Sequence, residues 1–214
     1  MEDFWFEFVE ITQAIGDGLL FGSTYALIGI GFTLIFGAMG KLNMAYAGAA
    51  IAGAYVGLAA FVLISAPLIV VFFVAAIAAA LFGYLIYLSC FRFIPTSNHL
   101  AALMASVGGL FFIDEVIVHA TRGSPFTFPS MFEYSYFEIG PYGIRGDLIF
   151  VFFIGLISTG ALLFILYRTR LGLATRAVAQ QDIAARLCGI GVHSTNSITF
   201  AIAGLLGGIA GAMT

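Results

Sequence analysis

Charged residues are scarce in this sequence of 214 residues. Asp, Glu, Lys and Arg make up 9% of it, whereas 62% of the residues are hydrophobic. Soluble domains usually contain about 25% charged residues and roughly 45–50% apolar residues. So few charges cannot solvate the surface of a protein of this composition. A soluble enzyme, a nucleic-acid-binding protein and a disordered chain are therefore excluded, and an integral membrane protein is indicated.

Cysteine is also rare, and the first residues are acidic. The two cysteines, Cys90 and Cys188, indicate neither a disulfide framework nor a metal knuckle, and no cofactor is expected. Met1-Glu2-Asp3 lacks the basic region that opens a secretory signal, so no cleavage is expected.

Long charge-free runs dominate the rest of the chain. A bilayer core needs roughly 20 apolar residues in a helix. Runs of this length lack the alternation of barrel strands, so helices are expected. We predict an all-α, polytopic membrane helix bundle, 1–214, with about six transmembrane helices. One of them, Leu100–His119, is weaker because Asp114 and Glu115 interrupt the apolar run. The five clear spans are Gly18–Phe36, Met44–Ile64, Leu68–Phe91, Leu148–Tyr167 and Ser197–Met213.

The basic residues predict that the N-terminus lies outside. In that orientation only Arg122 and Arg145 remain outside, and the cytoplasmic segments hold the other six: Lys41, Arg92, Arg168, Arg170, Arg176 and Arg186. Residues 1–17, acidic and aromatic, then form an interfacial leader. Because nothing follows the last span, we interpret the chain as truncated at its C-terminus.

Glycine pairs at small-xxx-small spacing predict close helix packing, or a pathway or subunit interface. They are Gly18/Gly22, Gly53/Gly57, Gly204/Gly208 and Gly207/Gly211. Between the first two spans, residues 37–44 predict a tight cytoplasmic hairpin or a partly re-entrant turn. Irregular polar backbone at that depth must face protein or a water-filled cavity, so Asn43 and Tyr46 are candidate pathway residues; the alternative is a capping Asn and an interfacial Tyr.

The longest cytoplasmic segment, residues 168–194, predicts a short helix. Asp182 is a good N-cap, and Gly189 suits the left-handed position after the helix end. A helix of about 9 Å is too short to be stable alone in water. It is therefore either a membrane-surface helix or a docking helix for a cytoplasmic partner.

The outer loop, residues 120–147, predicts a small hairpin. Tyr134–Ile139 has strand character and Gly140–Gly143 reads as a turn. The loop is either a landing surface for a binding protein or a plug over the helix ends.

Several segments together resemble the permeases of branched-chain amino-acid ABC importers. Residues 18–27 and 32–37 resemble the first span of that family, and Asn43-Met44-Ala45-Tyr46 with Gly53-Ala54-Tyr55 resemble the next. Residues 176–179 and 184–190 are similar to its cytoplasmic coupling loop, and residues 199–202 and 205–212 to the span that follows. Where Tyr46-Ala47-Gly48 stands, the family usually has His, then Gly and often an acidic residue. This departure bears on the substrate, and relatives that carry urea, amides or other amino acids are an alternative.

The resemblance implies a permease subunit in a bacterial inner membrane, with multiple spans. Its implied partners are two ATP-binding subunits, a second and usually homologous permease, and a periplasmic substrate-binding protein, besides membrane lipid. Substrate would pass between the permeases, with Ser23, Tyr25, Asn43 and Tyr46 as candidate pathway residues. The coupling segment would contact the ATPase through Arg176, Gln181, Asp182, Ala184, Ala185, Arg186, Leu187 and Gly189.

Two other classes of function remain as alternatives. A stand-alone secondary transporter or channel would need a charged residue in the middle of a span, and none is present. An intramembrane enzyme would need a catalytic set; Glu115 and His119 share a helix face without an evident third ligand. Gly40-Lys41 is not part of a phosphate-binding loop, so ATP hydrolysis is expected on partner subunits.

Overall fold

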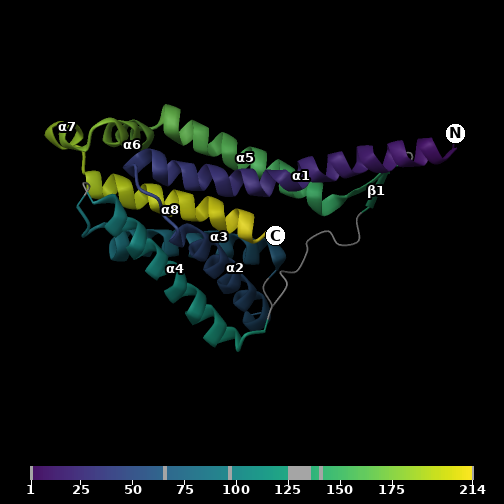
Figure 1. The fold of residues 1–214 in the computed structure, drawn as a ribbon, viewed down its shortest axis with the longest axis horizontal. Helices are drawn as coiled ribbons and strands as arrows, with labels where there is room; N and C mark the ends of the chain where they lie inside the picture. Colours follow the sequence, from purple (N-terminus) through teal and green to yellow (C-terminus); the bar gives the residue numbers. More distant parts are fainter. Residues whose placement is uncertain (1, 65–66, 96–97, 125–135, 140–141, 214) are drawn as a thin grey trace.

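The computed structural model describes residues 2–64, 67–95, 98–124, 136–139 and 142–213, and this part of the chain is largely helical (Figure 1). The π-helical segment η1 (Tyr87–Phe91) continues α3, and the strands are β1 (Tyr136–Ile139) and β2 (Tyr142–Arg145). The α-helices are α1 (Glu2–Met39), α2 (Ala45–Ile64), α3 (Leu68–Ile86), α4 (His99–Thr121), α5 (Gly146–Arg168), α6 (Arg170–Gln180), α7 (Asp182–Leu187) and α8 (Val192–Gly211).

Five of the described helices are long and apolar enough to cross a membrane, and they match the first five predicted spans, with Met44–Ile64 one residue longer at each end than the observed segment. They are Val9–Met39, Ala45–Leu63, Leu68–Phe91, His99–Thr121 and Leu148–Arg168. The sixth predicted span, Ser197–Met213, overlaps α8, which is not among the five and ends at Gly211. Helix α8 has the required length of 20 residues, but its first turns contain His193, Ser194, Thr195, Asn196 and Ser197. Thr195, Asn196 and Ser197 are buried by neighbouring helices and face protein, whereas His193 and Ser194 are exposed at the start of the helix.

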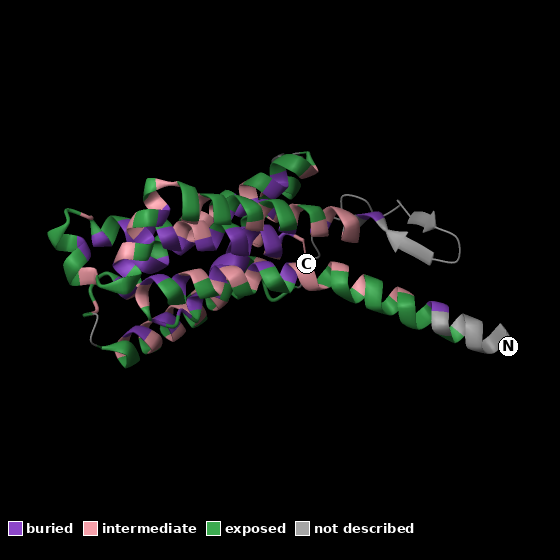
Figure 2. Ribbon diagram, turned by 90° about the horizontal axis from the view of Figure 1, so that it is seen from above, coloured by how far each residue is buried: buried purple, intermediate pink, exposed green. Residues whose placement is uncertain are grey.

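The N-terminal leader does not form a separate element in the structure. Residues 2–17 continue directly into the first span as α1, which extends well beyond the other helices (Figure 2). The glycines at positions 16 and 18 do not break the helix, because an isolated glycine costs only about 1 kcal/mol against alanine. The predicted boundary at Gly18 is therefore absent from the backbone.

Helices α2, α3 and α8 pack against one another, and α3 makes extensive contacts with both of the others. A Cβ atom at Gly57 of α2 would lie 2.7 Å from the Cβ of Ala75, and one at Gly208 of α8 would lie 3.0 Å from the Ala76 Cα. The small residues Ala75, Ala76 and Ala79 of α3 thus allow both helices to approach its backbone closely, as the glycine spacing predicts. The pairs Gly53/Gly57, Gly204/Gly208 and Gly207/Gly211 all meet a neighbouring helix.

The fourth glycine pair behaves differently. A Cβ atom at Gly18 or Gly22 of α1 would meet nothing within 4 Å in the described chain. Packing between helices of this chain therefore does not account for that pair.

The outer hairpin is present, with a shorter turn than expected. β1 and β2 pair antiparallel, with Tyr136 opposite Arg145 and Ile139 opposite Tyr142. Gly143, expected in the turn, lies in β2. Residues 125–135 and 140–141, which include the start of the expected strand and of the turn, lie outside the described residues.

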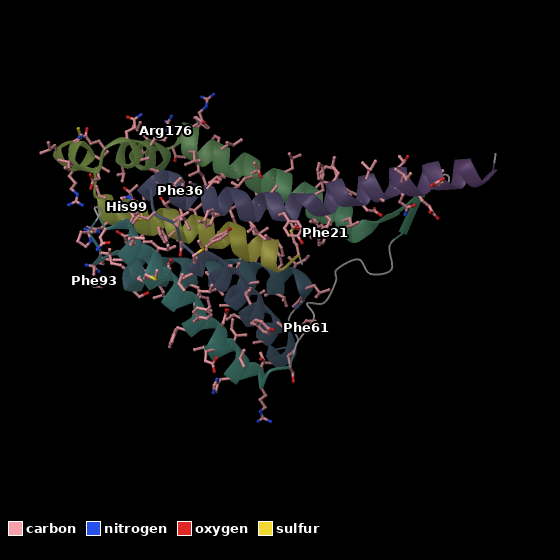
Figure 3. The ribbon with its side chains drawn as sticks, viewed as in Figure 1. Phe21, Phe36, Phe61, Phe93, His99 and Arg176 are labelled. Atoms are coloured by element: carbon pink, nitrogen blue, oxygen red, sulfur yellow. The ribbon has the colours of Figure 1, made fainter. Side chains whose placement is uncertain are left out.

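The basic residues separate towards the two ends of the bundle. Helices α6 and α7 lie beside the C-terminal end of α1 and the first turn of α8, whereas the N-terminus and β1 lie at the opposite end (Figure 1). Arg176 and His99 are found at the first of these ends (Figure 3). Arg122 follows α4 at its far end. We refer to the end with α6 and α7 as the basic end.

Candidate functional site

The site begins with a sharp connection between α5 and α6. The Thr169 side chain caps α6 by accepting a hydrogen bond from the Gly172 N–H at 3.2 Å. A Cβ atom at Gly172 would collide with the carbonyl oxygens of Ile165 and Leu166, so a side chain does not fit there. Helix α6 was missed in the sequence. The sequence feature that indicates this helix is the three-residue spacing of its buried residues, Gly172, Thr175 and Val178.

Helix α7 has the short length that the sequence predicts, but its cap is shifted by one residue. Gln181, in an extended conformation, is the N-cap, and its side chain makes no capping hydrogen bond. Asp182, predicted as the N-cap, is instead in the first turn, where a carboxylate still interacts favourably with the helix dipole. Gly189 adopts φ +81°, which confirms the left-handed position predicted for it.

The two faces of α7 differ in burial. Ala185 is buried against Val178 of α6 and Val192 of α8. The opposite face is apolar and exposed, because Ile183 is 64% and Leu187 is 85% accessible. Ala184 is exposed on this helix as well. A six-residue helix cannot hold itself together in water, so the contacts of Ala185 position it and leave Ile183 and Leu187 available to another surface.

Charges around α7 contribute little to its stability. Arg186 and Asp182 are i,i+4 partners at 3.9 Å, and both side chains are partly exposed. Arg176 of α6 lies over the exposed Tyr167 ring of α5 at 5.3 Å, a weak cation–π contact between the two helices. Of the eight predicted coupling residues, seven are at least partly accessible at the basic end, and Ala185 faces the chain itself.

The turn between α1 and α2 is also at the basic end. Residues 40–44 are irregular, and Gly40 adopts φ +64°. Lys41 is only 1% exposed, and its Nζ atom donates to the Ile94 and Pro95 carbonyls at 3.3 and 3.1 Å. Burial lowers the pKa of Lys41 below its ordinary value. A backbone polar group of the turn is also paired, because the Met44 N–H donates to the Ser106 hydroxyl at 3.2 Å. The turn therefore faces protein, as one of the two predicted alternatives requires.

The four candidate pathway residues occupy different environments. Tyr25 is 63% exposed on α1, and Ser23 faces Gly155 of α5 and donates to the Leu20 carbonyl at 2.7 Å. Asn43 and Tyr46 are buried, and Asn43 Oδ1 and the Tyr46 hydroxyl oxygen have no hydrogen-bond partner among the described residues.

Tyr46 fills the space between α1 and α8. Its hydroxyl lies where a side chain at Gly31 would be, and 3.0 Å from the Cβ position of Gly207. The alternative of an interfacial tyrosine at this position is therefore wrong. The structure does not bring the four pathway candidates together around one cavity.

A hollow lies elsewhere, between α2 and α4. It has a volume of about 640 Å³ and is almost entirely apolar, with Tyr55, Phe82, Phe112, Val116 and Arg122 among its walls. Sequence reasoning missed it, because the apolar residues of α2 and α4 show little helical periodicity, and a hollow between the two helices depends on the tertiary fold.

Comparison with known proteins places these features in a family. Residues 14–214 match the family described as "Branched-chain amino acid transport system / permease component". The chain is 28% identical to the high-affinity branched-chain amino acid transport system permease protein BraD of Pseudomonas aeruginosa, over 95% of this chain and 70% of BraD. It is 28% identical to the permease protein LivH of Escherichia coli, over 97% of this chain and 71% of LivH.

An archaeal relative is more distant. The probable branched-chain amino acid transport permease protein LivH of Methanocaldococcus jannaschii is 24% identical, over 91% of this chain and 63% of its own length. No solved structure matches the chain. The family match begins within α1 and includes every later helix, and the chain belongs to the family of permease components of branched-chain amino acid transport systems.

Proposed function

We propose that this chain is the permease subunit of a bacterial ABC importer that moves branched-chain amino acids, or related amino acids and amides, across the inner membrane. One observation carries the proposal beyond family membership. A short helix at the basic end, α7, is positioned by a buried alanine and presents exposed apolar side chains. Such a helix is suited to dock into a groove on a partner.

We place the basic end in the cytoplasm and the N-terminus outside. Six of the eight Lys and Arg residues belong to segments at that end, which the positive-inside rule assigns to the cytoplasm. The hairpin of β1 and β2 then lies on the periplasmic side, where a substrate-binding protein would deliver the solute.

We assign ATP hydrolysis to two separate ATP-binding subunits. The sequence contains no phosphate-binding loop. The contact with one of these subunits would be made by Ile183, Ala184 and Leu187 of α7. Arg176, Gln181, Asp182 and Arg186 would surround that contact, with Gly189 closing the helix. Closure of the ATPases would move α7 and rock the attached helices as rigid bodies.

Substrate would pass between this chain and a second, homologous permease. Support for a pathway on the outside of this chain comes from α1, where Tyr25 is exposed beside Phe21 at a ring distance of 5.6 Å. Further polar groups along this pathway would come from Ser23 of α1, Asn43 of the α1–α2 turn and Tyr46 of α2.

The docking role of α7 is tested by changing Leu187, which is exposed and makes no contribution to the buried clusters. The complex is reconstituted in proteoliposomes with its ATPases and binding protein, and uptake of radiolabelled leucine is measured. Leu187→Glu should abolish ATP-dependent uptake and co-purification of the ATPases, because a carboxylate would be buried in an apolar contact without a partner. Leu187→Met keeps the apolar surface and should retain both.

Normal uptake by the Leu187→Glu variant would show that α7 is a membrane-surface helix. Loss of uptake in both variants, with intact insertion, would show that the identity of Leu187 matters for another reason.

A further inference from the structure

The connection from α7 to α8 is short and contains several backbone hydrogen bonds. The Gly189 N–H donates to the Arg186 carbonyl and the Ile190 N–H to the Ala185 carbonyl, both at 3.0 Å. The Thr195 N–H then donates to the Gly191 carbonyl at 2.9 Å, within the first turn of α8. Ile190 also packs against the cluster of Val178, Ala185 and Val192. Because this link has little freedom, a displacement of α7 is passed to the first turn of α8.

The first turn of α8 is tied to α3 by a buried tyrosine. Tyr87 is 2% exposed, and its hydroxyl is hydrogen-bonded to His193 Nδ1 at 2.9 Å. The Tyr87 ring packs on Phe200 at 5.3 Å between ring centroids. One tyrosine thus contacts α8 at two positions, 193 and 200, which lie two turns apart on one helix face.

Tyr87 is also the first residue of the π-helical segment η1. The Arg92 N–H donates to the Tyr87 carbonyl at 2.9 Å, five residues away, so the turn is wider than in an α-helix. Such segments occur in α-helices often at functional positions. Further along, α3 and α8 pack backbone to backbone, because a Cβ at Gly83 would lie 2.5 Å from the Phe200 carbonyl oxygen. The two helices are therefore rigidly packed beyond Phe200, and their ends nearest α7 are joined through Tyr87.

We propose that Tyr87 is a positioning residue for transport, and that its hydroxyl, with His193, makes α3 follow α8 when α7 moves. This inference rests on the proposed function, because it takes α7 as the point where the ATPase acts. Without the hydroxyl, the ring of residue 87 still fills its place against Phe200. The contact with the first turn of α8 is lost, and movement of α7 reaches α8 without reaching the end of α3.

The test separates coupling from folding. The whole transporter, with its second permease, ATPases and binding protein, is reconstituted in proteoliposomes. Leucine uptake and ATP hydrolysis are measured together. Tyr87→Phe and His193→Ala should each lower the leucine transported per ATP by about 2- to 10-fold, the effect of one hydrogen bond. ATP hydrolysis without binding protein and co-purification of the subunits should not change.

Two further variants make the readout specific. His193→Gln offers a hydrogen-bonding group at the same position and should keep most of the coupling. His99→Ala, on an exposed residue at the same end, should behave as wild type. In the double variant Tyr87→Phe/His193→Ala the loss should equal that of one single variant, because both remove the same interaction.

Wild-type coupling in Tyr87→Phe or His193→Ala, or additive losses in the double variant, would overturn the role of Tyr87. If Tyr87→Phe fails to assemble, His193→Ala decides, since His193 is at the surface, and full coupling there overturns the proposal. A wild-type complex without ATP-dependent uptake would instead refute the proposed function, and the coupling role with it.

Discussion

Replacing Gly204 by alanine tests the central packing of the bundle. The new Cβ atom would lie 3.1 Å from the carbonyl carbon of Ala79 and 3.2 Å from the Cα of Ala80, and closer still to the Ala79 carbonyl oxygen. Carbon atoms in good contact are about 3.5–4.0 Å apart, so α3 and α8 must separate by several tenths of an ångström. All three neighbours are backbone atoms, and no side-chain rotation can relieve the contact.

The expected net cost is about 1–2 kcal/mol of unfolding free energy. Overpacking of this kind costs about 1–3 kcal/mol, and the gain in helix propensity of up to about 1 kcal/mol offsets part of it. For a soluble domain of this size, 1 kcal/mol corresponds to roughly 2–4 °C in unfolding midpoint. Gly204→Ala should therefore lower the midpoint of the detergent-solubilised chain by about 2–8 °C in a thermal scan.

Gly22→Ala is the matched control. A Cβ at this position of α1 meets nothing within 4 Å, so the midpoint should stay unchanged or rise. The reasoning would be refuted by a Gly204→Ala variant as stable as wild type beside a destabilised Gly22→Ala variant.

Two other predictions concern buried polar side chains. Lys41 is the only lysine of the sequence, and its burial should make it react with an amine reagent at least about 10-fold more slowly in the folded than in the unfolded chain. Burial lowers the pKa of Lys41, so between this lowered pKa and 10.5 the unfolded state binds more protons than the folded state. The free energy of unfolding should therefore rise with pH in that window. The rise should vanish in the Lys41→Met variant. Labelling at equal rates would contradict the buried position. Tyr46→Phe removes a hydroxyl that has no partner among the described residues, so the thermal midpoint should stay equal or rise by up to a few degrees. A large drop would mean that the hydroxyl has a partner.

The membrane-spanning helices could be predicted because bilayer thickness sets their length. The predicted spans and the observed helices agree within a few residues for α2, α3 with η1, α4 and α5. The boundary of α1 could not be predicted, because the acidic residues before Gly18 end the apolar run without ending the helix. Hydrophobicity marks where a helix enters lipid, whereas only capping and backbone geometry mark where it stops.

Packing partners were harder to predict than helices. The spacing of Gly53/Gly57 and of Gly18/Gly22 is the same, yet the first pair meets α3 and the second meets nothing in the described chain. Small residues show that close approach is possible, but the partner comes from the tertiary fold. Lys41 is a second example in which the partner could not be predicted. The positive-inside rule counts it as a basic residue of a cytoplasmic loop, whereas its hydrogen bonds to the Ile94 and Pro95 carbonyls join segments more than fifty residues apart.

The coupling segment was only partly predictable. The left-handed glycine after α7 follows from local chemistry, and Gly189 confirms it. The N-cap is wrong by one residue because Gln181 adopts an extended conformation that no side-chain preference indicates. The orientation of α7 depends on Ala185 packing against Val178 and Val192, which lie in two other helices.

The most direct measurement is purification of the chain from its native membrane in mild detergent, with mass spectrometry of the proteins that accompany it. The account predicts two ATP-binding subunits and a second permease in stoichiometric amounts, with the ATP-binding subunits lost in Leu187→Glu. A chain that purifies alone and still moves solute across a membrane would contradict the account, and a stand-alone transporter or channel would replace it.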